Sequence, residues 1–423
     1  MSERPVSNAV GAESAGDDNL GVQPQRPFVN RLRAQNYKSI KACDVRLGSL
    51  AILVGPNGSG KSNVLDALRF ITDSLATTLD HALRDRGGIS EVRRRSGGHP
   101  NHFAIRIDFQ LLTGHSGHYS FRVGAQPNGG FQVTDEECLV HSPELGQPDS
   151  RYRVRAGLVV STVPERLPAA VADRLFLVSA SSVEPFRAVY DALRDMGFYN
   201  LSPAVLRQLQ QPDPGLLLRR DGSNLASVLG HLEQHNPVVM ERITDYLQRL
   251  SPGVQGVAKQ IVGPMETIEF QQVVAGQQRP WRFGATNMSD GTLRGLGVLI
   301  ALLQSNSRPP TLVGIEEPEV ALHPAAVGVL IDAIRDAALS TQVLVTSHSP
   351  ELLDRDDIGD DVILAVQATN GITTVGPVDD ASRSALRSHL FTPGELLRMD
   401  QLVPSPEAVV ASRSEQPRLF DAP

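Results

Sequence analysis

Residues 50–68 read LAILVGPNGSGKSNVLDAL. An apolar run, a glycine-rich turn and apolar residues at helical spacing follow one another, which predicts a strand over 50–54, then a loop and a helix. The loop, residues 55–62, fits G-x-x-x-x-G-K-[ST], and this motif is meaningful between a strand and a helix. An ordinary glycine-rich turn is the alternative, and the two flanking elements argue against it. The stretch therefore predicts an α/β fold built around a phosphate-binding loop.

The chemistry of this loop follows from its residue types. Glycines let backbone N–H groups curl around phosphate oxygens, and the start of the helix adds the positive end of its dipole. Lys61 can reach the β- and γ-phosphates of a nucleotide, and Ser62 can ligate Mg²⁺. The residues expected to bind nucleotide are Asn57, Gly58, Ser59, Gly60, Lys61, Ser62 and Asn63.

A second apolar run, residues 311–315, ends in the acidic sequence EEPE at 316–319. A buried strand that ends in paired acids is where a phosphoryl-transfer site places its metal-binding acid and its water-activating base. Glu316 is therefore expected to hold Mg²⁺, directly or through water, and Glu317 to polarise the attacking water. An acidic turn after a strand is the alternative, which the upstream phosphate loop makes less favoured.

Two further segments can contact a nucleotide. A strand expected over 342–346 is followed by His348, which could contact the γ-phosphate and sense its loss. A plain surface histidine is the alternative. Ser289 precedes a helix and fits an N-cap. Beyond capping, Ser289 and the backbone of Gly291 could hold the γ-phosphate of a nucleotide bound to a second protomer.

The composition changes along the chain mark its organisation. Residues 1–26 and 404–423 have the composition of disordered tails. Short strand-like segments follow the first helix, so residues 27–184 are expected to form an N-terminal half with an antiparallel β subdomain. A helical pattern occupies 185–255, and α/β alternation returns in 256–403. We expect a P-loop α/β head in two halves, with a helical insertion between them.

Composition bounds the class of protein. The chain has 423 residues, of which 41% are hydrophobic and 21% charged, which excludes a mainly disordered or collagen-like chain. No apolar run approaches the ~18 residues of a membrane span, and no secretory signal is visible. The net charge of −7 excludes a uniformly basic surface, so polyanion binding would need a local patch. Cys43 and Cys138 cannot form a disulfide framework or a four-cysteine zinc site, so a cytoplasmic compartment is expected.

Four segments together resemble a known group of ATPases. They are GPNGSGKSN at 55–63, MSDGTLRGL at 288–296, IEEPEVALHP at 315–324 and TSHSPELLD at 346–354. The set is similar to the ABC-type ATPase heads of the SMC, RecF and OLD group, and most similar to stand-alone members labelled AAA-family ATPases. The resemblance covers about residues 28–400.

This resemblance implies an ATP-sandwiched homodimer that uses ATP and Mg²⁺. In it Ser289 and Gly291 act in trans, Glu317 is the catalytic base, His348 is the switch histidine and residues 321–323 lie at the D-loop. Glu316 stands where most ABC proteins have aspartate, although this subgroup commonly carries EEPE. Gln110 is a candidate for the Q-loop glutamine by its distance from Lys61, but it falls inside an expected strand.

The resemblance also implies a role in DNA repair or phage defence, through DNA or a partner effector. The long interval between Lys61 and Ser289 argues against the alternative of a transporter ATPase subunit. A second alternative is a nucleotide-regulated scaffold that does not bind DNA. OLD proteins carry a nuclease domain after the head, and too few residues follow His348 for one, so a nuclease or other effector is expected to be a separate chain.

Three weaker signals complete the sequence reading. A glycine-punctuated arginine cluster could grip phosphates of DNA or contact a partner, with a solvated loop as the alternative. Its members are Arg84, Arg86, Arg93, Arg94 and Arg95. Gln416, Leu419 and Phe420 resemble a sliding-clamp-binding peptide. His231 and His235 have the spacing of metal ligands on a helix, although plain surface positions are favoured.

Overall fold

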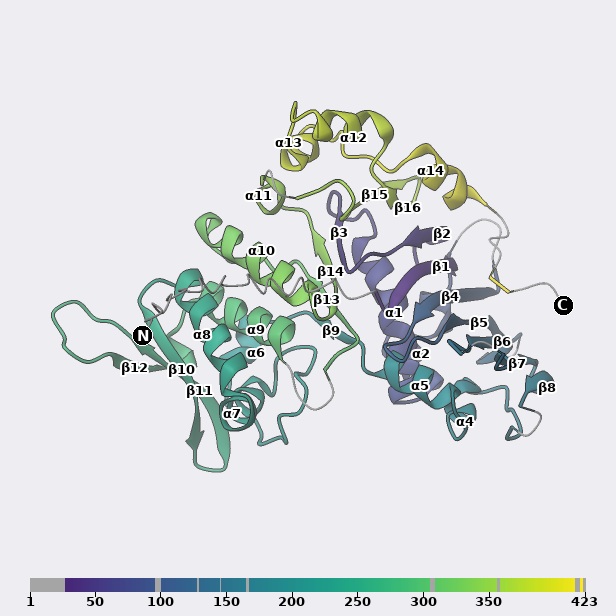
Figure 1. Ribbon diagram of the computed structural model, residues 1–423, viewed down its shortest axis with the longest axis horizontal. Coiled ribbons are helices and arrows are strands. Elements are labelled where there is room, and N and C mark those ends of the chain that lie inside the picture. Colours follow the sequence, from purple (N-terminus) through teal and green to yellow (C-terminus); the bar gives the residue numbers. More distant parts are fainter. Residues whose placement is uncertain are drawn as a thin grey trace, which may run out of the picture.

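The computed structural model describes residues 27–95, 100–127, 129–144, 146–164, 167–304, 309–355, 358–414 and 419–420. Residues 1–26, for which we expected disorder, lie outside this part of the chain. Three β-sheets and their surrounding helices make up the described residues (Figure 1).

The central sheet has six strands in the order β16-β15-β3-β14-β13-β9. Their bounds are β3 (Leu50–Val54), β9 (Gly197–Tyr199), β13 (Leu312–Glu316), β14 (Gln342–Ser347), β15 (Ile363–Thr369) and β16 (Ile372–Pro377). β3 pairs in parallel with β14 and β15, and β13 pairs in parallel with β14 and β9. Only β16, at one edge, is antiparallel to its neighbour. All six residues of β14 are buried because both faces of the sheet are covered.

Two cores lie on the two faces of this sheet. On one face, α1 (Lys61–Ala76) and the second sheet share a core with Leu53 of β3. On the other face, α9 (Asp290–Leu303) and α10 (Pro324–Ala338) share a core with Ile52 of the same strand. Because successive side chains of a strand point to opposite faces, β3 contributes to both cores. The loop after β3 therefore follows a strand that cannot move without disturbing both cores.

The second sheet is antiparallel and has the strand order β2-β1-β4-β5-β6-β7-β8. Its strands are β1 (Val29–Tyr37), β2 (Ile40–Arg46), β4 (His102–Gln110), β5 (Ser116–Ala125), β6 (Phe131–His141), β7 (Ser150–Arg155) and β8 (Leu158–Val163). Edge-to-face contacts among Tyr37, Phe70 and Phe103 join this sheet to α1. The expected antiparallel subdomain is confirmed, and it packs against the helix that follows the phosphate loop.

A buried carboxylate fastens this subdomain to α4 (Leu177–Ala180). Glu136 of β6 is fully buried and accepts hydrogen bonds from the hydroxyls of Tyr119 and Tyr152. It also accepts bonds from the backbone N–H groups of Phe176 and Leu177. Burial raises the pKa of the Glu136 carboxyl to about 7, although these four donors favour its charged form.

The raised pKa of Glu136 predicts that the stability of the folded protein falls as the pH rises. The folded protein keeps a proton that the unfolded chain loses near pH 4.5. The contribution of Glu136 to stability is therefore full below that pH and is lost as the pH rises through about 7, at a cost of about 3 kcal/mol. Urea unfolding at pH 5 and pH 8 should show this decline in the wild type. The non-titrating Glu136→Gln variant should lack it, and an equal decline in both proteins would contradict the prediction.

The interval 185–255 is not purely helical. It contains α5 (Phe186–Arg194), α6 (Pro203–Leu206), α7 (Leu225–His235) and α8 (Pro237–Leu250). It also contains β9, which pairs with β13 and forms an edge of the central sheet. Tyr199 of β9 is buried in the core beneath α9, so tertiary packing selects the strand there. The proposed boundaries at 185 and 255 stay predictions.

A third sheet was not expected. β10 (Val254–Val262), β11 (Met265–Gln272) and β12 (Trp281–Gly284) form an antiparallel sheet that packs on α7 and α8 (Figure 1). A 3₁₀ turn, η1 (Ala285–Asn287), then leads into α9. Phe270 of β11 is fully buried, and this strand completes the core on the α9 side of the molecule.

The expectation of a disordered C-terminal tail from 404 is wrong for its first part. Residues of this stretch form α14 (Pro406–Arg413), capped by Ser405, which packs on β2 and β16. Ser412 is buried and accepts a hydrogen bond from Thr374 of β16, so contact with the sheet stabilises a helix that composition does not indicate.

The remaining short helices are α2 (Leu79–Arg84), α3 (Ile89–Val92), α11 (Pro350–Leu353), α12 (Asp380–Arg387) and α13 (Pro393–Arg398). Among the residues described, no helix is long and apolar enough to cross a membrane.

Candidate functional site

The phosphate loop lies between β3 and α1, as its motif requires. Gly58 and Gly60 have φ angles of 79° and 100°, values that favour glycine. Gly60 is also the residue before the first turn of α1, so the loop ends at a helix N-terminus. The arrangement presents backbone N–H groups and the positive end of a helix dipole on one side, which suits an anion.

Lys61 and Ser59 are both buried in the loop. The ammonium group of Lys61 donates hydrogen bonds to the carbonyls of Gly55 and Pro56, at 2.8 and 3.0 Å. Burial lowers the pKa of this ammonium group, and the nearby carboxylates of Glu317 and Glu319 oppose the shift. The buried hydroxyl of Ser59 has no hydrogen-bond partner in the described part of the chain. These are polar groups that a phosphate could satisfy.

The hairpin of β15 and β16 supports the loop from behind, and sequence reasoning missed it. A Cβ at Gly60 would lie 2.1 Å from the hydroxyl of Thr373, and this hydroxyl donates to the carbonyl of Ser59. Asn63 donates to Ser39, whose hydroxyl is bonded to Thr373. The loop and the start of α1 are thus attached to Ser39, in the turn between β1 and β2, and to Thr373 of β16. Glycine is required at 60 because Thr373 occupies the space.

Glu317 and His348 form a pair at the end of neighbouring strands. Glu316 is the last residue of β13, and Glu317 follows with a φ of 45°, a left-handed value that is unusual for a residue with a side chain. The N–H of Glu317 donates to the carbonyl of Thr346 at 2.9 Å, and its Oε1 atom lies 3.0 Å from Nδ1 of His348. Strained backbone of this kind persists where surrounding contacts hold it, and it is frequent at functional sites.

The phosphate loop, the acidic segment and His348 lie together at the carboxyl ends of the central strands. β3, β14 and β13 are adjacent and parallel, and Val54 and Glu316 lie opposite Ser347 and Thr346 of β14. The phosphate loop, His348 and the carboxylates therefore all follow the carboxyl ends of these strands. Ligands of open α/β sheets bind at the carboxyl ends of the strands.

Arg294 and Arg220 join this site without having been identified from the sequence. Arg294 of α9 is buried and donates to the carbonyls of Glu316 and Glu317, at 3.1 and 2.9 Å, and to that of Leu201. Arg220 contacts the Glu316 carboxylate at 3.5 Å. An isolated arginine in an apolar helix such as α9 would have signalled a buried polar contact.

Ser289 and Gly291 lie at the start of α9. The hydroxyl of Ser289 accepts a hydrogen bond from the N–H of Thr292, so the expected N-cap is present. A Cβ at Gly291 would lie 2.5 Å from the carbonyl of Ala321, whose own φ is 68°. Within the described chain, neither residue is hydrogen-bonded to the phosphate loop. Their cis contacts are with α9 and the 321–323 segment.

Gln110 does not fit the Q-loop. It is the last residue of β4, and it lines a cavity of about 240 Å³ together with Thr311 and Gln342. Thr311 precedes β13 and Gln342 begins β14, so this cavity is at the amino ends of the central strands. Because the phosphate loop is at the carboxyl ends, the suggestion based on distance along the sequence is wrong.

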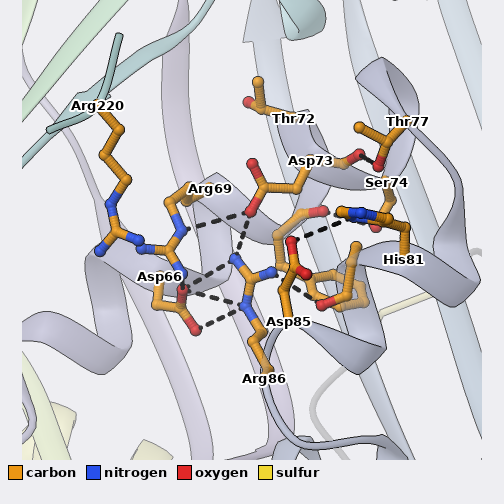
Figure 2. A network of polar contacts seen from close by, with 12 residues as sticks. Asp66, Arg69, Thr72, Asp73, Ser74, Thr77, His81, Asp85, Arg86 and Arg220 are labelled. Carbon is orange, nitrogen blue, oxygen red and sulfur yellow. Dashed lines mark hydrogen bonds and ion pairs between the residues drawn. The ribbon is translucent and has the colours of Figure 1, made fainter. Parts of the chain in front are cut away.

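Arg86 is not free to bind a phosphate. Its side chain is 3% exposed and pairs with Asp66 at 2.9 Å and with Asp73 at 2.8 Å. Asp66 of α1 also pairs with Arg69 (Figure 2), and it pairs with Lys38. These cations hold the pKa of the Asp66 carboxyl well below its usual range. Arg86 therefore stabilises the helix that follows the phosphate loop.

The other arginines of the cluster also have partners in the protein. Arg94 is buried and donates to the carbonyls of Ser39 and Gly371, and Arg93 donates to the carbonyl of Pro100. Arg84 and Arg95 are exposed and pair with Asp80 and Glu91. The cluster is not a set of five available cations, and only Arg84 and Arg95 could contact DNA or a partner.

Two further sequence hypotheses can be compared with the structure. Leu419 is buried and the Phe420 ring lies 4.9 Å from the Arg122 guanidinium of β5, so both residues contact their own chain. Gln416 lies outside the described residues. A sliding clamp could bind this peptide only after its release. The rings of His231 and His235 stack at 4.3 Å on α7.

Comparisons with known proteins agree with this geometry. A family model described as "AAA domain, putative AbiEii toxin, Type IV TA system" matches residues 50–153 and 189–354, more than half of the chain. The chain belongs to this family. Its matched residues include the phosphate loop, both carboxylates and His348.

Solved structures show the same fold. The crystal structure of an SMC head bound to the C-terminal winged-helix domain of ScpA is 15% identical, with a TM-score of 0.50 over 82% of this chain and 97% of that one. An SMC head from Pyrococcus furiosus, bound to the C-terminal domain of ScpA, is 13% identical, with a TM-score of 0.50 over 86% and 99%. The fold is that of an ABC-type P-loop ATPase head.

Curated relatives match over shorter stretches. The DNA replication and repair protein RecF of Vibrio cholerae serotype O1 is 51% identical over 41 residues, 10% of this chain and 11% of RecF. The structural maintenance of chromosomes protein 4 of Schizosaccharomyces pombe is 36% identical over 89 residues, 20% of this chain and 6% of that protein. The matches thus cover a small part of these relatives. Together, the family match, the shared fold and these short matches support an SMC/RecF-like ATPase head, and such a family indicates nucleotide hydrolysis.

Proposed function

We propose that this family member hydrolyses ATP in a homodimer that closes when ATP binds and opens after hydrolysis. One observation carries the proposal. The phosphate loop, the Glu316–Glu317 pair and His348 follow the carboxyl ends of three adjacent strands, and Glu317 lies 3.0 Å from His348. This is the constellation that in-line attack of water on a γ-phosphate needs.

The residues have separate roles in this proposal. Lys61 leaves the carbonyls of Gly55 and Pro56 to contact the phosphates, and Ser59 gains a partner for its buried hydroxyl. Glu317 polarises the attacking water, and His348 contacts the γ-phosphate and senses its loss. Asn57, Gly58, Gly60 and Asn63 complete the phosphate loop.

Ser62 and Glu316 fit a magnesium ion. Both offer hard oxygen ligands, and Mg²⁺ in such sites is held by one or two protein ligands together with phosphates and water. Groups of three or more candidate metal ligands are absent from the described residues, which is compatible with this mode of binding. The ion would neutralise charge that develops on the phosphates.

Ser289 and Gly291 are proposed to contact nucleotide on the partner protomer. In cis, Ser289 bonds to its own helix and Gly291 lies against Ala321, while the N-terminus of α9 stays available as an anion site. A Ser289→Arg variant should bind ATP, but it should lose ATP-driven dimerisation and turnover because the arginine obstructs both composite sites of its homodimer. Size-exclusion chromatography with ATP and a phosphate-release assay measure the two properties.

Mixing two inactive variants tests the trans arrangement directly. In a heterodimer of Lys61→Ala and Ser289→Arg protomers, one of the two composite sites has both residues intact. In an equal mixture at most half of the dimers are mixed and each has one intact site, so turnover should return to at most about a quarter of the wild-type value. Ser340→Arg, at an exposed serine near the amino end of β14, is the matched control. A mixture that stays inactive, with both variants folded, would rule out sharing of the site.

The dimer is proposed to act on DNA or on a separate effector chain. The names of the RecF relatives favour DNA repair, and the family description, which mentions a toxin system, favours a defence function. ATP turnover measured with and without duplex and single-stranded DNA discriminates between DNA and an effector chain as the target. Stimulation supports a DNA-gated enzyme, and indifference supports the alternative of a nucleotide-regulated scaffold for an effector.

A further inference from the structure

Glu319 is a third carboxylate at the candidate site, and the roles given to the acidic segment do not include it. It lies in the loop after β13 and is only 7% exposed. Its Oε1 atom accepts a hydrogen bond of 2.5 Å from the hydroxyl of Ser347, the fully buried last residue of β14. Its Oε2 atom is buried without a hydrogen-bond partner among the described residues. A carboxylate placed in this way needs a reason, since burial of a charge is costly.

The bond to Ser347 connects the two loops that carry the catalytic pair. The Ser347 hydroxyl also accepts a bond of 3.0 Å from the N–H of Ser349, so Glu319, Ser347 and Ser349 form a bracket around His348. The side chains of His348 and Glu317 are themselves 38% and 35% exposed. Their own contact is therefore open to water, while Glu319 and Ser347 beside it are buried.

The backbone around Glu319 requires such support. Glu317 and Ala321 both have left-handed φ angles, and Glu319 lies midway between them. Left-handed backbone in residues other than glycine persists when several contacts determine it. Here the contacts are the N–H bond from Glu317 to Thr346, the Arg294 bonds to the carbonyls of Glu316 and Glu317, and the bracket. Turn bonds from Val320 to Glu317 and from Leu322 to Glu319 add to these within the segment. The bracket starts at the middle of the segment and extends to the loop that carries His348.

We propose that Glu319 is a positioning residue that holds the His348 loop against Glu317 through the hydroxyl of Ser347. This inference rests on the proposed ATPase function. Glu319 contacts neither water nor phosphate in this role. It provides a fixed acceptor, so that the orientation of His348 toward Glu317 is set before nucleotide binds.

Three substitutions test this role by steady-state kinetics. Glu319→Ala and Ser347→Ala each break the bracket and should lower kcat about 10- to 100-fold, with a KM for ATP within about 2-fold of wild type, as for other supporting residues of active sites. Glu319→Gln keeps an acceptor oxygen for Ser347 and should retain kcat within about 3-fold. The double variant should be no slower than Glu319→Ala, because both changes remove one interaction.

The controls separate this role from a loss of stability and from a charge effect. Ser384→Ala removes an exposed hydroxyl of α12 that donates to the carbonyl of Asp380, away from the bracket, so it should match wild type. A parallel loss of kcat and ATP affinity would indicate damage to the fold and contradict the proposal. A Glu319→Gln variant as slow as Glu319→Ala would show that the charge matters, and additive effects would show that Ser347 is not the link.

Failure of this inference can be told from failure of the proposed function. If the wild-type protein does not hydrolyse ATP, or if Glu317→Gln hydrolyses it normally, the function itself is wrong. If the wild type is active and Glu317→Gln is inactive, unaltered turnover in Glu319→Ala and Ser347→Ala overturns only the positioning role.

Discussion

Glu317→Gln is expected to reduce ATP turnover by at least ~100-fold, since removal of a positioned general base costs this much or more. Glutamine keeps an oxygen that His348 can contact, so the pair at 3.0 Å is disturbed little apart from the loss of the base. ATP binding should persist, because the phosphate loop is untouched. The variant should accumulate as an ATP-bound dimer, which size-exclusion chromatography can detect beside the phosphate-release assay.

A matched control for this experiment is Glu241→Gln, which makes the same chemical change at an exposed position of α8. Its turnover should equal that of the wild type. Normal turnover by Glu317→Gln would remove Glu317 as the base. A variant that no longer binds ATP would instead show that the strained loop after β13 needs the carboxylate to keep its conformation.

Asp66→Ala is expected to lower the free energy of unfolding by about 3–5 kcal/mol, the usual cost of leaving buried charges without their partner. The Asp66 carboxylate is 7% exposed and pairs with Arg69 and Arg86 (Figure 2). It also pairs with Lys38 and accepts a hydrogen bond from the hydroxyl of Tyr37. The midpoint of urea unfolding measures the effect. An unchanged midpoint would contradict a structural role for this network.

The effect of Asp66 should also depend on pH. A carboxyl whose pKa is lowered by folding contributes stability that is present above its unfolded pKa, near 4, and is lost as the solution becomes more acidic. The difference in the free energy of unfolding between the wild type and Asp66→Ala should therefore become smaller below about pH 4. Asp80→Ala is the control, because Asp80 pairs with exposed Arg84 and such surface pairs contribute about 0–1 kcal/mol.

The candidate site was predictable to the extent that its chemistry is local. The phosphate loop requires glycines and a lysine at fixed spacing, so the strand expected over 50–54 and the helix expected after the loop agree with β3 and α1. The apolar strand expected over 311–315 also agrees with β13, within one residue at each end. The roles of these side chains stay predictions.

Other features depend on contacts between distant parts of the chain and escaped prediction for that reason. β9 is a three-residue segment within a helical pattern, and it becomes a strand because β13 offers it an edge more than a hundred residues later. Arg86 belongs to an arginine cluster in the sequence, but Asp66 and Asp73 take it into the interior. Periodicity and charge counts carry no information about such partners.

By itself, then, the sequence determined the ATPase family of this chain and the chemistry available to its motifs, because both depend on residue types at short fixed spacings. The tertiary structure decided which of those residues meet, which arginines are available and what supports the Glu317–His348 pair. Strand pairing and burial settle these questions, since a hydrogen bond such as that of Ser347 to Glu319 exists only when two strands bring their ends together.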